Sequence, residues 1–341
     1  MGAISHWVCM PARAPRLAAT VAGGLPATLG PATFDAGTLV SLAGLPVSGP
    51  RLELWRAPTD NDRGAGFGAY GPDDPWLNNG RGVPAPSSET LWKQAGLDRL
   101  TRRVEDVAAL PDGLWLRTRY AAADSTHSVA VEENWHLAGG ELWLRADIRP
   151  SSGWDVVWPR IGVRFDLPAD VDGADWFGAG PRASYPDSRR SALVGRHAGS
   201  IDELNVQYAR PQETGHRSDV RWLELARDGA SWLRIDAGPD AAGRRPGFTL
   251  VRHTAQEITT AGHPHELPAP SHSYLSVDAA QNGLGSRACG PGVWPEFALR
   301  PEARTLVLRI SAGQPHNARP LPPSWRACGT LVGLRQILVS S

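Results

Sequence analysis

The sequence predicts an all-β fold, a large antiparallel β-sandwich, from three observations. Apolar and polar residues alternate with a period of two in many segments after residue 104, as in a half-buried strand. Gly and Pro are frequent, with 37 and 30 copies, as expected for many short strands joined by turns. Helical periodicity is nearly absent, and this favours antiparallel sheets packed as a sandwich.

The N-terminal part is predicted to hold a lead-in, a hairpin and a strand. Residues 1–30 are rich in Ala, Gly, Pro and Arg without a sustained period, so we expect a poorly ordered lead-in. Residues 34–40 predict a hairpin with a DAG turn. Residues 52–55 alternate as a strand, which Pro58 ends because proline has no N–H to donate.

A polar turn and a glycine-rich stretch follow this strand. Asp60, Asn61 and Asp62 have short side chains that can bond nearby backbone and hold a tight turn. Residues 64–71 contain four glycines and two aromatic residues, and glycine lets a loop move. A rigid polar turn before a mobile aromatic loop suits the rim of a small-molecule site. The alternative is an ordinary turn at a strand end, followed by a flexible loop.

Strand periodicity is clearest at residues 114–120, 142–148 and 161–167. Turn signals, DG at 112–113 and AGG at 138–140, precede the first two of these segments. Further strand-like runs lie at residues 220–225, 231–235, 248–252, 273–278 and 305–310.

Two short helices interrupt the strands. Residues 88–95 predict one, closed by Gly96 at the position where helices commonly end. The second begins at Thr254, which forms a capping-box pattern with Glu257, and Gly262 is placed to end it.

The chain is long enough for one large all-β domain. It has 341 residues, of which 41% are hydrophobic and 14 are Trp, which is ample material for a core. Periodicity is lost after residue 310. We therefore expect a poorly ordered lead-in at 1–30, one β-sandwich domain at 31–311 and an irregular tail at 312–341.

Charge and cysteine content argue against several kinds of partner. The 35 basic residues balance 35 acidic ones, so net charge favours neither nucleic acid nor an acidic membrane surface. No apolar run approaches the length of a membrane span, and we recognise no signal peptide. The three cysteines are scattered and odd in number, which fits a reducing compartment. We expect a cytoplasmic protein with no nucleic-acid or membrane partner.

Eight short motifs, in six groups, follow one another along the chain. They are RAPTDNDRG at 56–64, WKQAGL at 92–97, WFGAGP and YPD within 176–187, PQETG and DVRW within 211–222, HPHEL at 263–267 and GLGSRACGPG at 283–292. In this order they resemble the C-terminal, or small-chain, domain of β-galactosidases of glycoside hydrolase family two. The resemblance covers residues 31–310.

The resemblance implies a galactose mutarotase-like supersandwich that completes the active site of a separate catalytic large chain. That enzyme hydrolyses terminal non-reducing β-D-galactose residues, as in lactose and galactoside catabolism. In the family, a TIM barrel carries both catalytic glutamates and binds Mg and Na ions. This sequence lacks the barrel's alternation of strands and helices. We therefore expect no catalytic residue, cofactor or metal in this chain, inactivity when alone, and an oligomer with the large chain.

The resemblance also implies four substrate-binding positions. Gly64, Phe67 and Tyr70 belong to the family's mobile loop beside the site. Cys289 stands where better-known members place a tryptophan on the leaving-group side. A thiol has less stacking surface than an indole, so weaker binding of the leaving sugar is expected. The alternative for Cys289 is a buried structural cysteine.

Several other polar and aromatic residues have two interpretations. The aromatic candidates for sugar stacking, which more often pack in a core, are Trp176, Tyr185, Trp222 and Trp294. The residues interpreted as turn-makers rather than sugar ligands are Asp60, Asn61, Asp62, Tyr185 and Asp187. The HPHE motif at 263–266 has two imidazoles, but the proline between them restricts the backbone, so no metal site is expected.

Two alternative functions belong to other classes. One is a non-catalytic carbohydrate-binding domain. The other is a mutarotase-like sugar epimerase, which needs its own acid and base. His216 and Glu213 form the pair that could serve in those roles.

Overall fold

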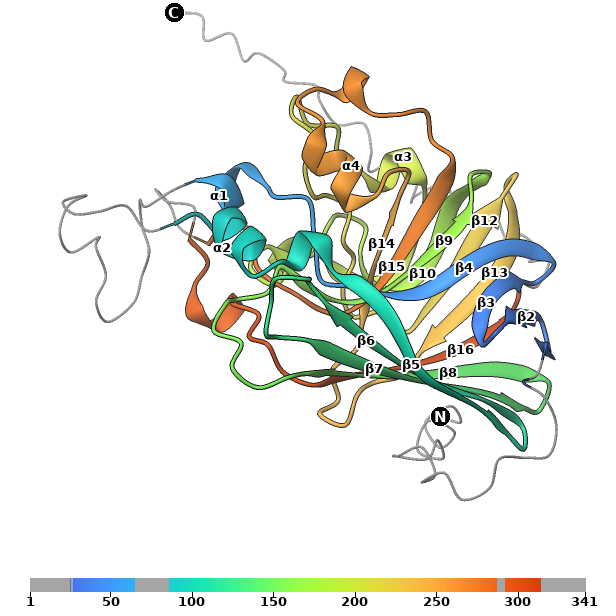
Figure 1. Cartoon of the computed structure of the whole chain (residues 1–341). Helices are drawn as coiled ribbons and strands as arrows, with labels where there is room; N and C mark the ends of the chain where they lie inside the picture. The colour runs from blue at the N-terminus through green and yellow to red at the C-terminus, as the bar shows by residue number, and fades with distance from the viewer. Residues whose placement is uncertain (1–24, 26, 65–85, 287–291, 314–341) are drawn as a thin grey trace, which may run out of the picture.

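Two antiparallel sheets form a sandwich in the computed structural model, which describes residues 25, 27–64, 86–286 and 292–313 (Figure 1). The smaller sheet has seven strands in the order β1-β2-β3-β4-β9-β15-β14. The larger sheet has nine, in the order β11-β10-β12-β13-β16-β8-β7-β6-β5. All the strand pairings between these elements are antiparallel. The predicted all-β sandwich is confirmed.

Strands build both layers, and the helices are short connections between them. The smaller sheet consists of β1 (Thr28–Leu29), β2 (Ala32–Asp35), β3 (Thr38–Leu42), β4 (Leu45–Glu53), β9 (Arg160–Pro168), β14 (Gly247–Val251) and β15 (His272–Gln281). The larger sheet consists of β5 (Thr101–Leu110), β6 (Gly113–Ala121), β7 (Val129–Ala138), β8 (Glu141–Pro150), β10 (Val171–Gly180), β11 (Leu193–Ser200), β12 (Trp222–Arg227), β13 (Ala230–Ala237) and β16 (Arg304–Ala312). The helices are α1 (Asp60–Arg63), α2 (Ser88–Gln94), α3 (Ile201–Leu204) and α4 (Ala255–Thr260), with 3₁₀ turns at Leu97–Arg99, Arg189–Ser191, Pro264–Glu266 and Pro295–Phe297.

The hydrophobic core lies between the two sheets. On β6, Leu114, Leu116 and Tyr120 are buried on one face, as the two-residue period predicted. Across the sandwich, Phe34 of β2 packs edge-to-face on Trp135 of β7 with ring centroids 5.3 Å apart. Residues of both sheets therefore share a single core.

Two of the predicted hairpin turns are confirmed, whereas Gly113 of the predicted DG turn is the first residue of β6. Ala36 and Gly37 have φ values of 45° and 82° and join β2 to β3. Gly139 and Gly140 have φ values of 61° and 81° and join β7 to β8. Such positive φ angles favour glycine, which explains the AGG signal.

The two predicted helices occur, and one predicted turn is itself a helix. α2 begins one residue after Ser87, whose side chain accepts from the Thr90 N–H. α4 has the expected capping box between Thr254 and Glu257. The predicted tight turn at residues 60–62 is instead the single helical turn α1, because a capping box stabilises the helical form there. Figure 1 shows α1 and α2 side by side at one end of the sandwich.

The ends of the chain are described only in part. Strand β1 lies within residues 1–30, and β16 ends at Ala312. The remainder of the two terminal segments, residues 1–24, 26 and 314–341, falls outside the description. None of the described helices is both long and apolar enough to cross a membrane.

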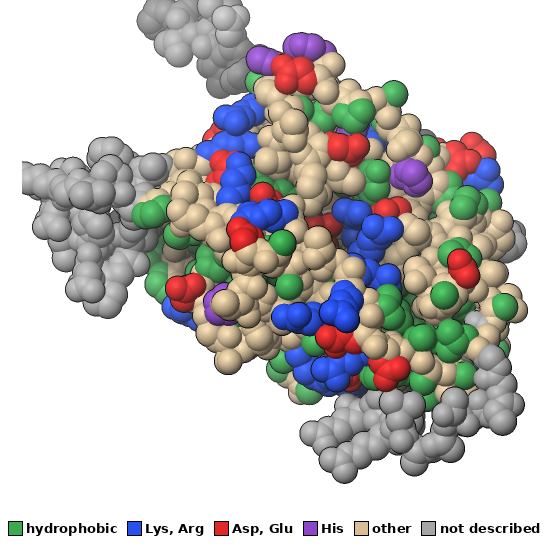
Figure 2. Space-filling model, in the orientation of Figure 1, with side chains coloured by type: hydrophobic (Ala, Val, Ile, Leu, Met, Phe, Trp, Pro, Cys, Tyr) green, Lys and Arg blue, Asp and Glu red, His purple; other side chains and the backbone are tan. Residues whose placement is uncertain are grey.

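Charges of both signs are mixed on the surface. Figure 2 shows Lys and Arg side chains interspersed with Asp and Glu on the face it presents. Ion pairs that include exposed arginines also join neighbouring strands, such as Arg117 with Glu105 at 3.1 Å and Arg149 with Glu132 at 3.0 Å. This agrees with the balanced composition.

Candidate functional site

Arg56 is a fully buried cation that joins two segments distant in sequence. Its Nη2 donates to both Asp62 oxygens, at 2.9 and 3.1 Å, and to the Gly283 carbonyl at 2.9 Å. Its Nη1 donates to the Asn282 carbonyl at 2.9 Å, 226 residues along the chain. The guanidinium carbon also lies 5.3 Å from the centroid of the Trp92 ring. Arg56 thus ties the RAPTDND segment (residues 56–62) to the start of a second loop.

Asp62 has two roles in this arrangement. Its Oδ2 accepts from the Thr59 N–H and hydroxyl, both at 2.9 Å, which completes the capping box of α1. The same carboxylate compensates the buried charge of Arg56. The local helix and the long-range clamp therefore depend on one side chain.

The second loop, residues 282–286, is held from two sides and is called the clamp loop below. Asp187 accepts from the Leu284 N–H at 3.1 Å, the Gly285 N–H at 2.8 Å and the Ser286 hydroxyl at 3.1 Å. From α1, Asn61 Nδ2 donates to the Leu284 carbonyl at 3.0 Å. Gly285 has a φ of +142°, and a Cβ there would lie 2.3 Å from Asn61 Nδ2, so the close approach requires glycine.

The structure describes one of the four predicted substrate-binding residues. Gly64 ends α1, where its N–H donates to the carbonyls of Asp60 at 3.0 Å and Asn61 at 3.2 Å. Phe67, Tyr70 and Cys289 lie outside the described residues, so their assignment stays a prediction.

The two stretches that contain the predicted substrate-binding residues begin next to α1 and the clamp loop. Gly64 follows α1 directly, and Ser286 ends the described part of the clamp loop. Asn61 joins α1 to that loop through Leu284. The glycine-rich stretch that begins at Gly64 and the stretch that contains Cys289 are therefore anchored at adjacent points of the fold.

Trp294 is the aromatic candidate for sugar stacking that contacts the clamp loop. Its backbone N–H donates to the Ser286 hydroxyl at 3.3 Å, and its side chain is 40% exposed. An exposed indole at this position has the surface needed to stack on a sugar ring. By contrast, Trp176 and Tyr185 are each 1% exposed and pack internally. Trp222 packs on Phe177 at the outer face of the larger sheet, with centroids 6.4 Å apart.

A buried ionic cluster precedes the clamp loop. Arg160 donates to the two oxygens of Asp278 at 2.9 and 2.7 Å, and His216 Nδ1 lies 3.3 Å from Asp278 Oδ2. Burial by itself would raise the pKa of Asp278, but Arg160 and His216 outweigh burial and lower this pKa to about 2. Asp278 is therefore ionised at any ordinary pH.

His216 and Glu213, the candidate pair for an epimerase, belong to this cluster. The Tyr185 hydroxyl donates to Glu213 at 3.0 Å, and burial raises the pKa of the Glu213 carboxyl. His216 lines a small pocket, whereas Glu213 does not. That pocket therefore does not bring the two side chains together as an acid and a base acting on one sugar.

The HPHE motif caps a short turn. Glu266 accepts from the Gly262 N–H at 2.8 Å and lies 3.1 Å from His263 Nδ1. The His263 and His265 rings stack with centroids 5.5 Å apart. The described residues contain no group of three or more potential metal ligands.

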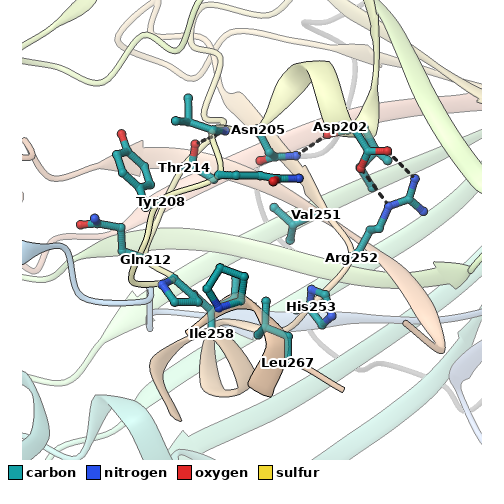
Figure 3. Close-up of a pocket in the computed structure, with 15 residues that line it drawn as sticks. Asp202, Asn205, Tyr208, Gln212, Thr214, Val251, Arg252, His253, Ile258 and Leu267 are labelled. Carbon is teal, nitrogen blue, oxygen red and sulfur yellow. Dashed lines mark hydrogen bonds and ion pairs between the residues drawn. The ribbon is translucent and has the colours of Figure 1, made fainter. Parts of the chain in front are cut away.

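An apolar pocket of about 280 Å³ lies between α3 and α4, and one of its lining residues, Gln212, contacts α1 (Figure 3). Val251, Ile258 and Leu267 form part of its wall. At its rim, Val206 is 56% exposed and Tyr208 is 42% exposed. Exposed apolar residues around an apolar hollow are typical of an interaction surface.

One residue of the pocket wall forms a hydrogen bond with α1. Gln212, which lines the pocket, accepts from the Asp60 N–H at 2.9 Å. Gln212 therefore links the wall of the pocket to α1, which supports the clamp loop.

Sequence reasoning missed the residues that hold the site together. Arg56 was noted only as part of a motif, and Asp187 only as a turn-maker, because their partners are far away in sequence. Arg160, Asp278 and Gln281 were not considered. Gly162 carries a signal that could have helped, since a Cβ there would lie 2.7 Å from the Asp278 Cα. A glycine within a strand can mark such a close approach of another backbone.

The family assignment comes from comparison with known proteins. A family model for the beta galactosidase small chain matches residues 32–310. A β-galactosidase of Arthrobacter sp. (strain B7) is 76% identical over 302 residues, which cover 89% of this chain and 30% of that protein. A β-galactosidase of Vibrio cholerae is 30% identical over 278 residues, which cover 78% of this chain and 24% of that protein.

A solved structure and the relatives' lengths complete these comparisons. A galactose mutarotase related enzyme from Lactobacillus acidophilus has a TM-score of 0.38 and 10% identity, and covers 82% of this chain and 92% of that one. The chain spans 30% of the length of the Arthrobacter relative and 24% of the Vibrio relative. Because the small-chain model covers most of the sandwich, this chain belongs to the β-galactosidase small-chain family.

Proposed function

We propose that this chain completes the active site of a catalytic large chain that hydrolyses terminal non-reducing β-D-galactose residues, as in lactose. One structural observation carries the proposal: Arg56, Asn61 and Asp187 hold the starting points of both predicted site loops together. A domain that supplies the wall of a site needs loops whose bases are rigid, because a small displacement of a binding group lowers the rate steeply.

The chemistry of hydrolysis belongs to the partner in this proposal. A retaining glycosidase needs two carboxyl groups about 5 Å apart, one ionised and one protonated. Near the described anchor, the Asp62 carboxylate is bound by Arg56 and Thr59, and Asp187 is bound by the clamp loop. Both carboxylates are occupied with holding structure. We therefore assign this chain a positioning role and no acid or base.

Contact with the leaving group is the second part of the proposal. Trp294 donates its backbone N–H to Ser286, the last described residue before the stretch that contains Cys289, and the residue is 40% exposed, which leaves aromatic surface for stacking. Gly64, Phe67, Tyr70 and Cys289 complete the proposed wall. Cytoplasmic location is part of the same proposal and rests on the three scattered cysteines.

The test is reconstitution with the Arthrobacter relative. The segment of that enzyme that matches this chain is deleted, and the remainder is purified and mixed with the 341-residue chain. We expect neither component alone to hydrolyse a chromogenic β-galactoside and the mixture to do so. Turnover by this chain alone, after removal of host enzyme, would refute the positioning role. A stable complex without activity would refute the proposed contribution to the site.

A further inference from the structure

A second, smaller pocket lies beside the buried ionic cluster, at the end of β15. Its volume is about 130 Å³. The residues that line it and are used below are Ser184, His216, Arg245, Asp278, Ala280 and Gln281. It shares no lining residue with the apolar pocket between α3 and α4.

A β-bulge builds the floor of this pocket. In a regular strand Asp278 and Gln281 would face opposite sides, because side chains alternate with a period of two. The pairing of β15 with β9 shifts register between Asp278 and Ala280, and the extra residue turns both polar side chains to the same side. Gln281 Nε2 then donates to Asp278 Oδ2 at 3.1 Å.

Polar groups of the pocket remain without partners. Gln281 is 5% exposed, and its Oε1 is buried with no hydrogen bond from any described residue. Ser184 is fully buried and accepts from the N–H and the hydroxyl of Ser218, so its own proton is free to be donated. A buried polar atom without a partner costs on the order of 1–3 kcal/mol, so such atoms usually mark a bound water or ligand.

His216 faces the same space. A Cβ on Gly247 would lie 2.3 Å from the imidazole Cε1 and 2.6 Å from Nε2, so the absence of a side chain there makes room for the ring. Nδ1 lies 3.3 Å from Asp278 Oδ2 but is buried without a well-formed hydrogen bond, and the described hydrogen bonds of His216 use its backbone rather than Nε2. Nε2 is thus available for a ligand, as a donor or an acceptor according to its tautomer.

The hydrogen-bonding groups and charges of the pocket limit the kind of ligand that it can bind. The free Gln281 oxygen is an acceptor and needs a hydrogen-bond donor, which a simple anion such as sulfate lacks. Arg160 occupies the Asp278 oxygens, and Arg189 and Arg245 line the pocket, so a metal cation is also disfavoured. Adjacent donors and acceptors instead match hydroxyl groups, each of which donates and accepts.

The volume of the pocket limits the size of the group that it can bind. A volume of about 130 Å³ corresponds to roughly four water-sized groups, at ~30 Å³ for each water in the liquid. Two carbons and two hydroxyls of a sugar ring edge have this size. We propose that the pocket binds a neutral monosaccharide by one vicinal diol, with Gln281 Oε1, His216 Nε2 and the Ser184 hydroxyl as its partners.

The proposal is independent of hydrolysis and is tested on the 341-residue chain without a large chain. The probe is D-galactose, followed by saturation-transfer NMR and by the shift of the melting temperature at increasing sugar concentration. Ala280→Val should fill the pocket without altering its polar network and raise the dissociation constant at least tenfold. Gln281→Leu removes the free acceptor and should have a similar effect. The melting temperature without sugar shows that each variant is folded.

A variant in the apolar pocket serves as the control for galactose binding in the smaller pocket. Tyr208→Ala changes the rim of the apolar pocket and should leave galactose binding unchanged. Loss of binding in Tyr208→Ala, with normal binding in a folded Ala280→Val, would overturn the assignment. Glycerol also has a vicinal diol, and binding of glycerol as tight as that of galactose would overturn the choice of a monosaccharide. Absence of galactose binding by the unaltered chain, with only ordered water in the pocket of a crystal soaked in galactose, would overturn the site.

Discussion

At the residue scale, surroundings rather than residue type decide what an acidic side chain does. Asp60 and Asp62 lie in the same helical turn, but the side chain of Asp60 is 71% exposed and that of Asp62 only 3%. The sequence marks both as polar turn residues. It could not assign Asp62 to Arg56 as a buried partner, because burial of Arg56 depends on carbonyls that arrive 226 and 227 residues later.

Replacing Asp62 and Asp60 one at a time should show how much of the unfolding free energy depends on the buried Arg56–Asp62 ion pair. Asp62→Asn removes the charge that compensates buried Arg56, and loss of one partner of a buried pair costs about 3 kcal/mol of unfolding free energy. Asp60→Asn should change it by less than about 0.5 kcal/mol, as exposed substitutions usually do. Urea denaturation of the two variants provides the comparison. Equal effects would show that the clamp does not stabilise the fold.

Glu133 gives a prediction about pH. It is 2% exposed on β7, and burial raises the pKa of its carboxyl from 4.5 to about 7, although Trp135 and Arg102 partly oppose this. Between these pH values the folded state binds more protons than the unfolded state, so stability falls as pH rises through 7. The full loss corresponds to about 3 kcal/mol. Glu133→Gln stays neutral, so it should match the unaltered protein near pH 5 and exceed its stability at pH 8.

The control for this prediction is the neighbouring residue on the other face of β7. Glu132 pairs with Arg149 at 3.0 Å, so Glu132→Gln should change the urea midpoint by a similar small amount at both pH values. If Glu133→Gln lowers stability equally at pH 5 and pH 8, the raised pKa has no influence on folding.

At the element scale, alternation located the strands that have one buried face. Strand β9 was predicted within one or two residues, and its apolar residues Ile161 and Val163 are buried. β11 was missed because it is an edge strand with exposed apolar residues and two glycines, so its residues do not alternate by polarity. α3 was missed too, although Ser200 and Glu203 form a capping box that could have revealed it.

The clamp loop offers a prediction at the same scale. Asp187→Ala removes the acceptor of the Leu284 and Gly285 amides, so these amides should exchange with deuterium at least tenfold faster. Asp202→Ala is the control, because Asp202 is an exposed partner of Arg252 away from the loop. Hydrogen–deuterium exchange with mass spectrometry measures both. Unchanged exchange at residues 284–285 would mean that Asn61 and Arg56 hold the loop without Asp187.

For the whole molecule, the order of the motifs predicted the family, and the two-residue alternation of apolar and polar residues predicted the sandwich. The candidate site could be predicted only in part. The sequence predicted two stretches for it, and that prediction remains untested, but the bonds that join the described ends of these stretches link residues 97 to 227 positions apart. Such contacts follow from the order of strands in the two sheets, which local patterns do not specify. The two pockets could not be predicted for the same reason, since each is lined by several separate segments.

The apolar pocket between α3 and α4 leads to a prediction about assembly. The relatives that match this chain are more than three times its matched length, and the proposed function requires the remaining part of such an enzyme to pack against this domain. The rim residues Val206 and Tyr208 are exposed, and Gln212 connects the pocket to α1 and thus to the proposed site wall. We therefore expect the pocket to receive an apolar side chain of the catalytic part of the enzyme.

Val206→Asp should test this contact, because it places a charge at the rim of the pocket, on a surface that would be buried on assembly. A buried unpaired charge is costly, so the dissociation constant for the remainder of the Arthrobacter enzyme should rise at least a hundredfold. Leu193→Asp is the matched control: Leu193 is 74% exposed on edge strand β11 and does not line the pocket. Both variants should unfold at the same temperature as the unaltered chain, since both residues are exposed in it. Analytical ultracentrifugation or biolayer interferometry then measures association. If Val206→Asp associates as tightly as Leu193→Asp and restores equal galactoside hydrolysis, the large chain packs elsewhere, and the pocket has no part in assembly.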